Sequence, residues 1–202
     1  MKKGLMIVVS GPAGSGKGTV NALLLQSDEY VYSVSATTRA PRPGEVDGKN
    51  YYYVSKEEFE RRISEGEMLE YTQYCRNYYG TPLREALEVM DSGKNLILEI
   101  EVEGALNVKR LYPEAVLIML LPPSFKVQEA RLRGRGTEDE ETIQARLQRT
   151  REELAYLEHY DYVVCNREGG AEACAQEIRD IVHAEKCAMK RHPDAAKKYF
   201  AN

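Results

Sequence analysis

The segment of this chain that carries the clearest chemistry is rich in glycine and contains one lysine. It reads G-P-A-G-S-G-K-G-T, and it lies between a short apolar run and a stretch whose apolar residues have helical spacing. Glycines let successive backbone N–H groups converge on phosphate oxygens, and a helix N-terminus adds partial positive charge. The lysine can reach the outer phosphates. The segment therefore predicts a P-loop for a nucleoside triphosphate, formed by Gly11, Pro12, Ala13, Gly14, Ser15, Gly16, Lys17, Gly18 and Thr19.

One position of this loop departs from the strict P-loop pattern. A hydroxyl residue directly after the lysine normally ligates Mg²⁺, but Gly18 stands there and the hydroxyl follows at Thr19. We therefore expect Mg²⁺ to accompany ATP and to be held mainly by phosphates and water, with Thr19 as the candidate for a direct ligand. A dinucleotide-binding loop is disfavoured, because its third glycine would have to stand where Thr19 is.

A second group of residues could bind a phosphate. Arg39 and Arg42 lie three residues apart across a proline turn and offer two guanidinium forks to a dianion. Tyrosines gather around them, and their hydroxyls could supply neutral donors. Taken alone, the two arginines would more simply be a solvated basic turn, and beside a P-loop they favour a phosphate site. For Tyr52, Tyr53 and Tyr78 we expect packing in a core instead.

Residues 37–54 resemble the guanylate kinase signature at every specified position. The resemblance extends through 67–71, 77–82, 98–104, 131–138 and 163–166, and it covers roughly 5–181. It implies an enzyme that transfers the γ-phosphoryl group of Mg·ATP to GMP, giving GDP and ADP. The Lys-Gly-Thr variant of the loop is also similar to that of adenylate-kinase-like monophosphate kinases.

The resemblance also implies roles for individual residues. Those that would hold the acceptor phosphate are Ser35, Arg39, Arg42, Tyr51 and Tyr79. Glu70 and Thr81 would read guanine, the carboxylate accepting from N1–H and N2–H and the hydroxyl donating to O6. Glu99 and Glu101 would face the acceptor nucleotide or waters on Mg²⁺. With Lys17 and Arg39, the lid and core arginines Arg131, Arg135 and Arg146 would be catalytic, and Asn166 would line the adenine pocket.

Several of these residues have simpler interpretations that the sequence leaves open. Thr81 could be only the N-cap of a helix that Pro82 begins, and Asn166 could be a turn residue. Glu103 could be a solvated carboxylate. The Arg-Gly repeat from Arg133 could belong to an RNA-binding segment, but a single copy beside an acidic run disfavours this.

Composition and charge limit the possible partners. The 202-residue chain has 28 Lys and Arg against 32 Asp and Glu, hence a formal charge of −4. This balance disfavours a general nucleic-acid coat, and no apolar run approaches the length of a membrane span. Cys75, Cys165, Cys174 and Cys187 form no zinc pattern. We therefore expect a cytoplasmic protein with reduced thiols and small-molecule partners, GMP and ATP, no nucleic acid or membrane partner, and a monomeric or homo-oligomeric state.

The elements that must position these residues alternate between strands and helices. Strand-like runs at 5–9, 95–100, 116–121 and 162–165 are separated by helical patterns, the first of which covers 17–26. This alternation predicts an α/β fold with a parallel sheet flanked by helices. We expect one domain over 1–202, with core segments 5–35, 93–124 and 146–190. A GMP-binding subdomain at 36–85, a lid at 125–145 and a basic tail at 191–202 complete this prediction.

Capping signals mark where some of the helices begin. Ser55 followed by Glu58 predicts a capping box, and Thr81-Pro82 would open a helix that stops at Gly93. Residues 137–140 would cap a long helix with an apolar stripe. A last helix is expected over about 171–190, and the tail after His192-Pro193 should be loosely held.

Two rival functions remain. A non-catalytic interaction module related to guanylate kinases would share the signature, and a monophosphate kinase for another base would share the P-loop. The chain retains Lys17, Arg39 and Arg42 together with the lid arginines, which favours the enzyme that uses GMP.

Overall fold

The computed structural model describes residues 3–74, 76–136 and 138–201, so Cys75 and Thr137 lie outside the described residues. Its main sheet has five parallel strands in the order β2-β7-β1-β8-β9. These strands are β1 (Met6–Ser10), β2 (Tyr30–Tyr32), β7 (Asn95–Leu98), β8 (Val116–Leu121) and β9 (Tyr162–Cys165). The expected α/β class with a parallel sheet is confirmed.

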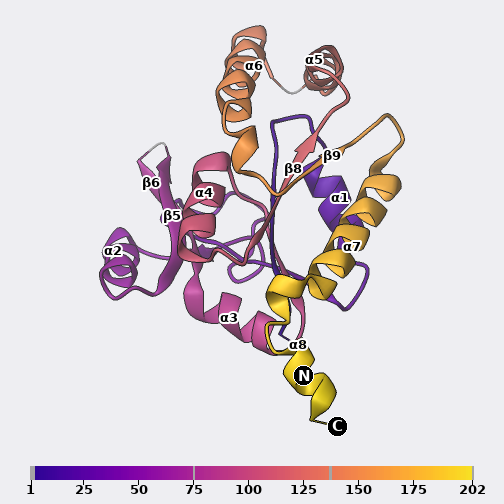
Figure 1. The fold of residues 1–202 in the computed structure, drawn as a ribbon. Helices are drawn as coiled ribbons and strands as arrows, with labels where there is room; N and C mark the ends of the chain where they lie inside the picture. Colours follow the sequence, from indigo (N-terminus) through magenta and orange to yellow (C-terminus); the bar gives the residue numbers. More distant parts are fainter. Residues whose placement is uncertain (1–2, 75, 137, 202) are drawn as a thin grey trace.

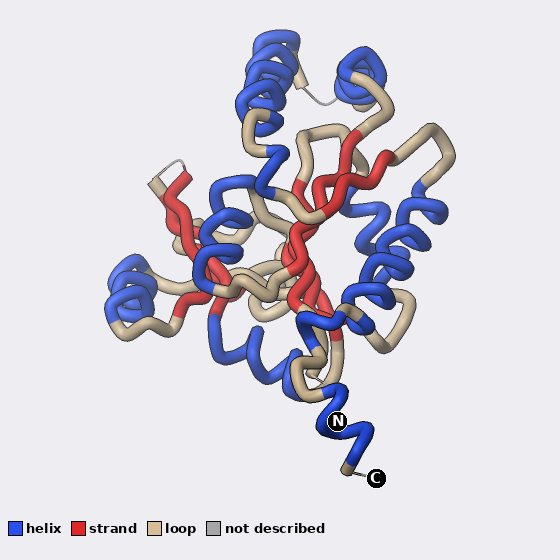
Figure 2. Tube along the Cα trace, in the orientation of Figure 1, coloured by secondary structure: helices blue, strands red, loops and turns tan. Residues whose placement is uncertain are grey.

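Helices cover both faces of this sheet (Figures 1 and 2). On one face lie α1 (Lys17–Leu24) and α7 (Ala171–Cys187), and on the other lie α3 (Leu83–Asp91) and α4 (Val102–Leu111). Both faces are buried, so the central strands are apolar almost throughout rather than alternating.

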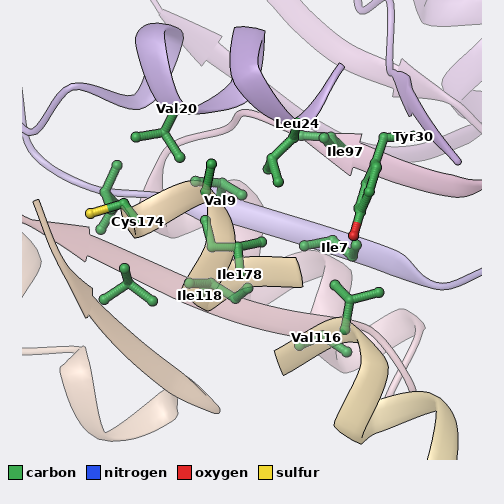
Figure 3. Packing of buried hydrophobic residues seen from close by; sticks show 14 of the residues in the cluster. Ile7, Val9, Val20, Leu24, Tyr30, Ile97, Val116, Ile118, Cys174 and Ile178 are labelled. Carbon is green, nitrogen blue, oxygen red and sulfur yellow. The ribbon is translucent and has the colours of Figure 1, made fainter. Parts of the chain in front are cut away.

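The side chains of β1 show how one strand serves two cores. Ile7 and Val9 point to the α1–α7 face, where Leu24 and Ile178 meet them (Figure 3). The alternate residues of β1 join the core under α3 and α4. Because successive strand residues face opposite sides, the sheet is fixed between two apolar layers.

A smaller sheet stands apart from the main one, on the side where Figure 1 labels α2, β5 and β6. It has the order β4-β3-β6-β5 and mixed direction. Its elements are β3 (Ala36–Thr37), β4 (Tyr52–Tyr53), α2 (Lys56–Ser64), β5 (Met68–Tyr74) and β6 (Asn77–Pro82). It has its own core of Ala36, Phe59 and Met68, and the ring of Tyr78 stacks on Phe59 at 5.2 Å.

The tyrosine predictions divide in this sheet. Tyr52 and Tyr78 pack against the small core, as expected. Tyr53 does not: its hydroxyl donates to the Glu45 carboxylate at 2.8 Å. A phenol can place an apolar ring and a polar oxygen in different surroundings, which the sequence pattern alone does not separate.

Two helices stand above the carboxyl end of the main sheet: α5 (Phe125–Gly134) and α6 (Glu140–Leu154). They meet through Leu132, Ile143 and Leu147, and Ala13 of the glycine-rich loop touches this cluster. Helix α6 runs without a break across the expected boundary between 145 and 146.

The observed starts of the helices differ in part from those predicted from the sequence. Ser55 caps α2 by accepting from the Glu58 N–H at 3.1 Å, while the Glu58 carboxylate bonds Arg61 and Arg62 instead of closing the capping box. Thr81 is not a helix cap, because it lies inside β6 and α3 begins after Pro82 without a side-chain cap. Asp139 caps α6, accepting from the Thr142 N–H.

The C-terminal segment is tied down at its start. After α7 come η2 (Met189–Arg191) and α8 (Ala195–Phe200), with η1 (Leu157–His159) earlier in the chain. Arg191 bonds the buried Glu185 at 2.8 Å and Glu114 at 3.1 Å, so the first residue of the expected basic tail is held against the core. Within the described chain, no helix is long and apolar enough to cross a membrane.

The separate small core predicts that Phe59→Ala acts locally. Truncating this fully buried ring should cost about 3 to 5 kcal/mol. In native-state hydrogen exchange, amides of β5 and β6 should lose protection more than those of β1 and β8. Ile178→Ala is the matched control, and it should lower the protection of amides in the main sheet instead. Equal losses in both sheets for both variants would mean that the two cores unfold as one.

Candidate active site

The glycine-rich loop leaves β1 and enters α1, whose first residue is Lys17. A Cβ on Gly11 would lie 2.2 Å from the carbonyl oxygen of Leu120, so only glycine lets the loop pass β8 this closely. Gly16 has φ 93° at the start of the helix, a conformation that L side chains rarely adopt. The N–H groups of the first turn of α1 therefore face the loop, as a phosphate site requires.

Lys17 folds over this loop. Its Nζ donates to the carbonyl oxygen of Gly11 at 2.5 Å and to that of Pro12 at 3.3 Å. Burial lowers the pKa of Lys17, and the carboxylates of Glu99, Glu153 and Glu101 oppose this shift. Arg135 adds to the lowering, which puts this arginine within electrostatic reach of the lysine.

Asn166 holds the glycine-rich loop by a side-chain hydrogen bond. Its side-chain amide donates to the Ser15 carbonyl oxygen at 2.7 Å, and its own carbonyl oxygen accepts from Arg131 at 2.9 Å. Arg131 also bonds the Gly14 carbonyl oxygen at 3.3 Å. Asn166 is buried, so its amide braces the cradle rather than forming a surface turn. A contact with adenine remains a prediction for this residue.

A cavity of about 180 Å³ opens between the small sheet and the carboxyl end of β7. Its lining brings together six of the residues that the sequence assigned to the acceptor nucleotide: Ser35, Tyr51, Glu70, Tyr79, Glu99 and Glu101. Glu103 lies exposed at its edge. The remaining acceptor residues, Arg39, Arg42 and Thr81, lie outside this lining.

Glu70 is a buried carboxylate at the wall of the cavity, with 4% of the residue exposed. The fully buried Thr81 hydroxyl donates to its Oε1 at 2.8 Å. A hydroxyl has one proton, and in this structure Thr81 gives it to Glu70. Donation from Thr81 to O6 of guanine stays a prediction, and it requires this proton to leave Glu70. Burial raises the pKa of Glu70, and the bonds from Thr81 offset part of that shift.

Arg39 is held by a carboxylate that sequence reasoning missed. Its Nη2 lies 2.9 Å from both Glu45 oxygens, and the guanidinium lies over the rings of Tyr51 and Tyr53. Glu45 also accepts from the Arg42 N–H at 2.7 Å, and these bonds lower the pKa of Glu45 to about 2. The only sequence signal was its position inside the signature.

Arg42 is exposed, and its guanidinium has no hydrogen bond or ion pair with any described residue. Its backbone N–H is fixed by Glu45, so the side chain extends from a well-held turn. The turn thus presents the Arg39 guanidinium paired with a carboxylate and the Arg42 guanidinium free to change its rotamer.

Glu99 and Glu101 are held differently at the end of β7. The Asn21 amide donates to Glu99 at 2.8 Å, which connects α1 with the cavity wall. Glu101 pairs with Arg149 of α6 at 2.5 Å. The two carboxylates therefore link the cavity with α1 on one side and with α6 on the other.

The expected lid arginines lie on α5 and α6. Arg146 pairs with Glu138 at 2.5 Å, and Arg135 follows the last turn of α5. Of the expected catalytic set, Lys17 and Arg131 bond the loop, whereas Arg39 lies on the side of the small sheet.

Other groups that could do chemistry lie elsewhere. Cys165, Cys174 and Cys187 are free thiols. Among the described residues, no group of three or more His, Cys, Asp or Glu could hold a metal ion. Near the cradle, the Thr19 hydroxyl is exposed and the carboxylates of Glu99, Glu153 and Glu101 act on Lys17, and such oxygens are hard ligands of the type Mg²⁺ accepts.

Comparison with known proteins identifies the relatives of this chain. Residues 3–185 match the family model described as guanylate kinase. The chain is 52% identical to a guanylate kinase of Halalkalibacterium halodurans, covering 94% of this chain and 93% of that protein. It is 46% identical to one of Clostridium tetani, covering 96% and 93%. The crystal structure of guanylate kinase from Anaplasma phagocytophilum is similar, with TM-score 0.74, 35% identity and coverage of 95% and 90%.

The buried Glu70 carboxylate predicts a pH-dependent stability difference. A carboxyl whose pKa is raised on folding holds its proton more tightly in the folded state, so stability falls as pH rises from the unfolded value near 4.5 through the folded one. Glu70→Gln removes this loss. Its melting temperature should exceed that of the unchanged protein by a few degrees at pH 8, and the gap should close toward pH 4.

Thermal denaturation followed by circular dichroism measures this difference. Glu168→Gln, in an exposed turn, is the matched control and should show no such trend. A gap that is absent at pH 8, or that widens toward acid, would contradict the effect of burial.

Proposed function

Because the chain belongs to the guanylate kinase family, we propose that the cavity beside its phosphate cradle is where it binds GMP for phosphorylation. The enzyme transfers the γ-phosphoryl group of ATP to GMP, giving ADP and GDP. The observation that carries the site assignment is that Glu99 and Glu101 line this cavity and also act electrostatically on Lys17. One pair of carboxylates thus borders both the loop for the donor phosphates and the cavity for the acceptor.

ATP binds, in this proposal, with its phosphates on the loop from Gly11 to Thr19. The loop amides and Lys17 hold the β- and γ-phosphates, and Lys17 exchanges its bonds with the loop carbonyls for phosphate oxygens. Asn166 keeps the loop in place through Ser15, which supports a bracing role alongside the proposed contact with adenine.

The acceptor phosphate binds between the basic turn and the cavity. Ser35, Tyr51 and Tyr79 supply hydroxyls from the cavity wall, and Arg39 lies against the ring of Tyr51. Arg39 can exchange the Glu45 carboxylate for phosphate, since both are oxyanions that fit its fork. Arg42, with an unpaired guanidinium, completes the clamp on the dianion.

Guanine is read by Glu70. Its Oε1 is bonded to Thr81, and its Oε2 lies 3.1 Å from where a Cβ of Gly104 would stand. The glycine therefore leaves room beside the second oxygen. A charged Glu70 can accept from the two adjacent donors of guanine, N1–H and N2–H. Adenine offers an acceptor at N1, so AMP would leave this buried charge unpaired.

Phosphoryl transfer itself needs positioning and charge more than covalent help. Arg131, Arg135 and Arg146 are proposed to stabilise the transferring group when α5 and the start of α6 close over ATP. Closure also excludes water, which would otherwise waste ATP by hydrolysis. The contact between Ala13 and the α5–α6 cluster supports a lid that responds to the loop.

Mg²⁺ is proposed to bind with ATP. When bound, it neutralises charge on the phosphates. Gly18 offers no side-chain oxygen, so phosphates and water would be the main ligands of the ion. The protein groups that could face it are the Thr19 hydroxyl and the carboxylates of Glu99 and Glu101.

The organisation proposed for the chain follows these roles. A GMP-binding subdomain at 36–85 is supported by its own small core, and a lid at 125–145 by the separate α5–α6 cluster. Core segments 5–35, 93–124 and 146–190 join them.

A cytoplasmic location agrees with the free thiols of the described cysteines. GMP and ATP are the proposed partners, without nucleic acid or membrane, in a monomer or homo-oligomer.

A panel of monophosphates tests the function and the base reader together. ADP formation from ATP should be fast with GMP and at least about 10⁴-fold lower in kcat/KM with AMP. CMP, UMP and dTMP should also be poor. Glu70→Gln should lower kcat/KM for GMP, with a loss of transition-state stabilisation of roughly 2 to 4 kcal/mol. The reason is that one acceptor becomes a donor that faces a donor of guanine. AMP should lose less.

Each other outcome of this panel has a meaning. Turnover of another base in preference to GMP would overturn the substrate, and no turnover with any would favour the non-catalytic module. If Glu70→Gln kept the full preference for GMP over AMP, Glu70 would not be the base reader.

Arg42→Ala tests the acceptor clamp. Losing a charged hydrogen bond to phosphate should raise KM for GMP by about tenfold or more and leave KM for ATP within about threefold. Steady-state kinetics with each substrate varied in turn measures both values. The control Arg84→Ala removes an exposed arginine on α3 and should change neither. Equal rises in both KM values would place Arg42 outside the GMP site.

A further inference from the structure

Asn21 lies one helical turn after Lys17 on α1, so the two side chains share a face of the helix. Its amide Nδ2 donates to Glu99 Oε2 at 2.8 Å. Only the nitrogen of the amide can donate to a carboxylate, so this bond also fixes the orientation of Asn21. The bond joins α1 to the end of β7, two elements that are distant in sequence.

Asn21 is a buried polar residue on a helix that also packs into the apolar core. The residue is 2% exposed, and its helix neighbours Val20 and Leu24 are fully buried in the apolar core. Its Oδ1 is buried and makes no hydrogen bond to any described residue. A buried amide with only one of its polar atoms bonded destabilises a fold. An asparagine at this position therefore suggests a functional role, which its bond to Glu99 would serve.

Glu99 occupies a position where orientation matters. It lines the acceptor cavity and is the carboxylate with the largest effect on Lys17. It also interacts with the hydroxyl of Tyr32. A glutamate side chain has several rotatable bonds, and ordering it for substrate costs entropy unless the protein has already fixed it.

We propose that Asn21 is a positioning residue for GMP, which it serves by holding the Glu99 carboxylate against the acceptor cavity. The inference rests on the proposed function, in which Glu99 faces the acceptor nucleotide. Asn21 itself touches neither substrate in this assignment. It acts through Glu99 alone, and this distinguishes it from a residue that merely completes the core.

Asn21→Leu is the informative variant, because leucine has a similar shape and donates no hydrogen bond. It should raise KM for GMP about tenfold, the size of one bond to a charged group, and leave KM for ATP within about threefold. Its melting temperature should stay within a few degrees of that of the unchanged enzyme, because the loss of the bond to Glu99 is offset by removal of the buried, unpartnered Oδ1. A purely structural asparagine would lose stability and affect both substrates.

A double-mutant cycle with Glu99→Ala tests whether the effect passes through Glu99. In the Glu99→Ala background, Asn21→Leu should change KM for GMP by less than about twofold. Gln26→Ala is the matched control, since it removes an exposed amide just beyond α1 and should alter neither KM. If Asn21→Leu does not fold, Asn21→Ala takes its place in the same cycle.

The outcomes separate this inference from the proposed function. Additive effects, or a normal KM for GMP in Asn21→Leu while Glu99→Ala is impaired, would overturn the role of Asn21 and leave Glu99 in the site. A normal KM for GMP in Glu99→Ala would overturn both the role of Asn21 and the assignment of Glu99 to GMP.

Discussion

The parallel pairing of β1 with β7 is the constraint on which both halves of the site depend. The pairs Met6 with Leu96 and Val8 with Leu98 bring the carboxyl ends of the two strands to the same edge. There the Ser10 hydroxyl donates to the Ile100 carbonyl oxygen at 2.8 Å. The glycine-rich loop continues from β1, and Glu99 and Glu101 follow β7, so the backbones that carry the two parts of the proposed site start one strand spacing, about 4.8 Å, apart.

Two arginines of the proposed phosphate sites are already paired with carboxylates of the protein. Arg39 holds Glu45, and Arg146 holds Glu138. These pairs keep long, flexible side chains in place, which lowers the ordering cost when a phosphate arrives. They also mean that a phosphate must compete with a carboxylate for the same fork. The net affinity at each arginine is therefore a difference between two anions, and it is smaller than a count of contacts would suggest.

The sequence predicted what is encoded locally. The phosphate loop, the strands β8 and β9, and the Ser55 cap all follow from neighbouring residues, and the structure agrees with them. The hairpin of β5 and β6 was missed, because its polar and tyrosine-rich pattern lacks a clear period. The partners of Thr81, Asn166 and Asn21 within the protein could not be predicted either, since they are distant in the chain. For such residues a hydrogen-bond partner exists only once the fold has formed.

The unbroken helix α6 sets how the region above the phosphate loop can move. Its 15 residues make a rod roughly 22 Å long, with the contact to α5 near one end and Glu153 near the other. A straight helix transmits rotation and hardly bends, so a turn of about 10° at its C-terminal end would carry its first turn by roughly 4 Å. Arg146 lies near the middle of α6, so the same rotation would carry its backbone by about half that distance, and α6 would act as a lever arm.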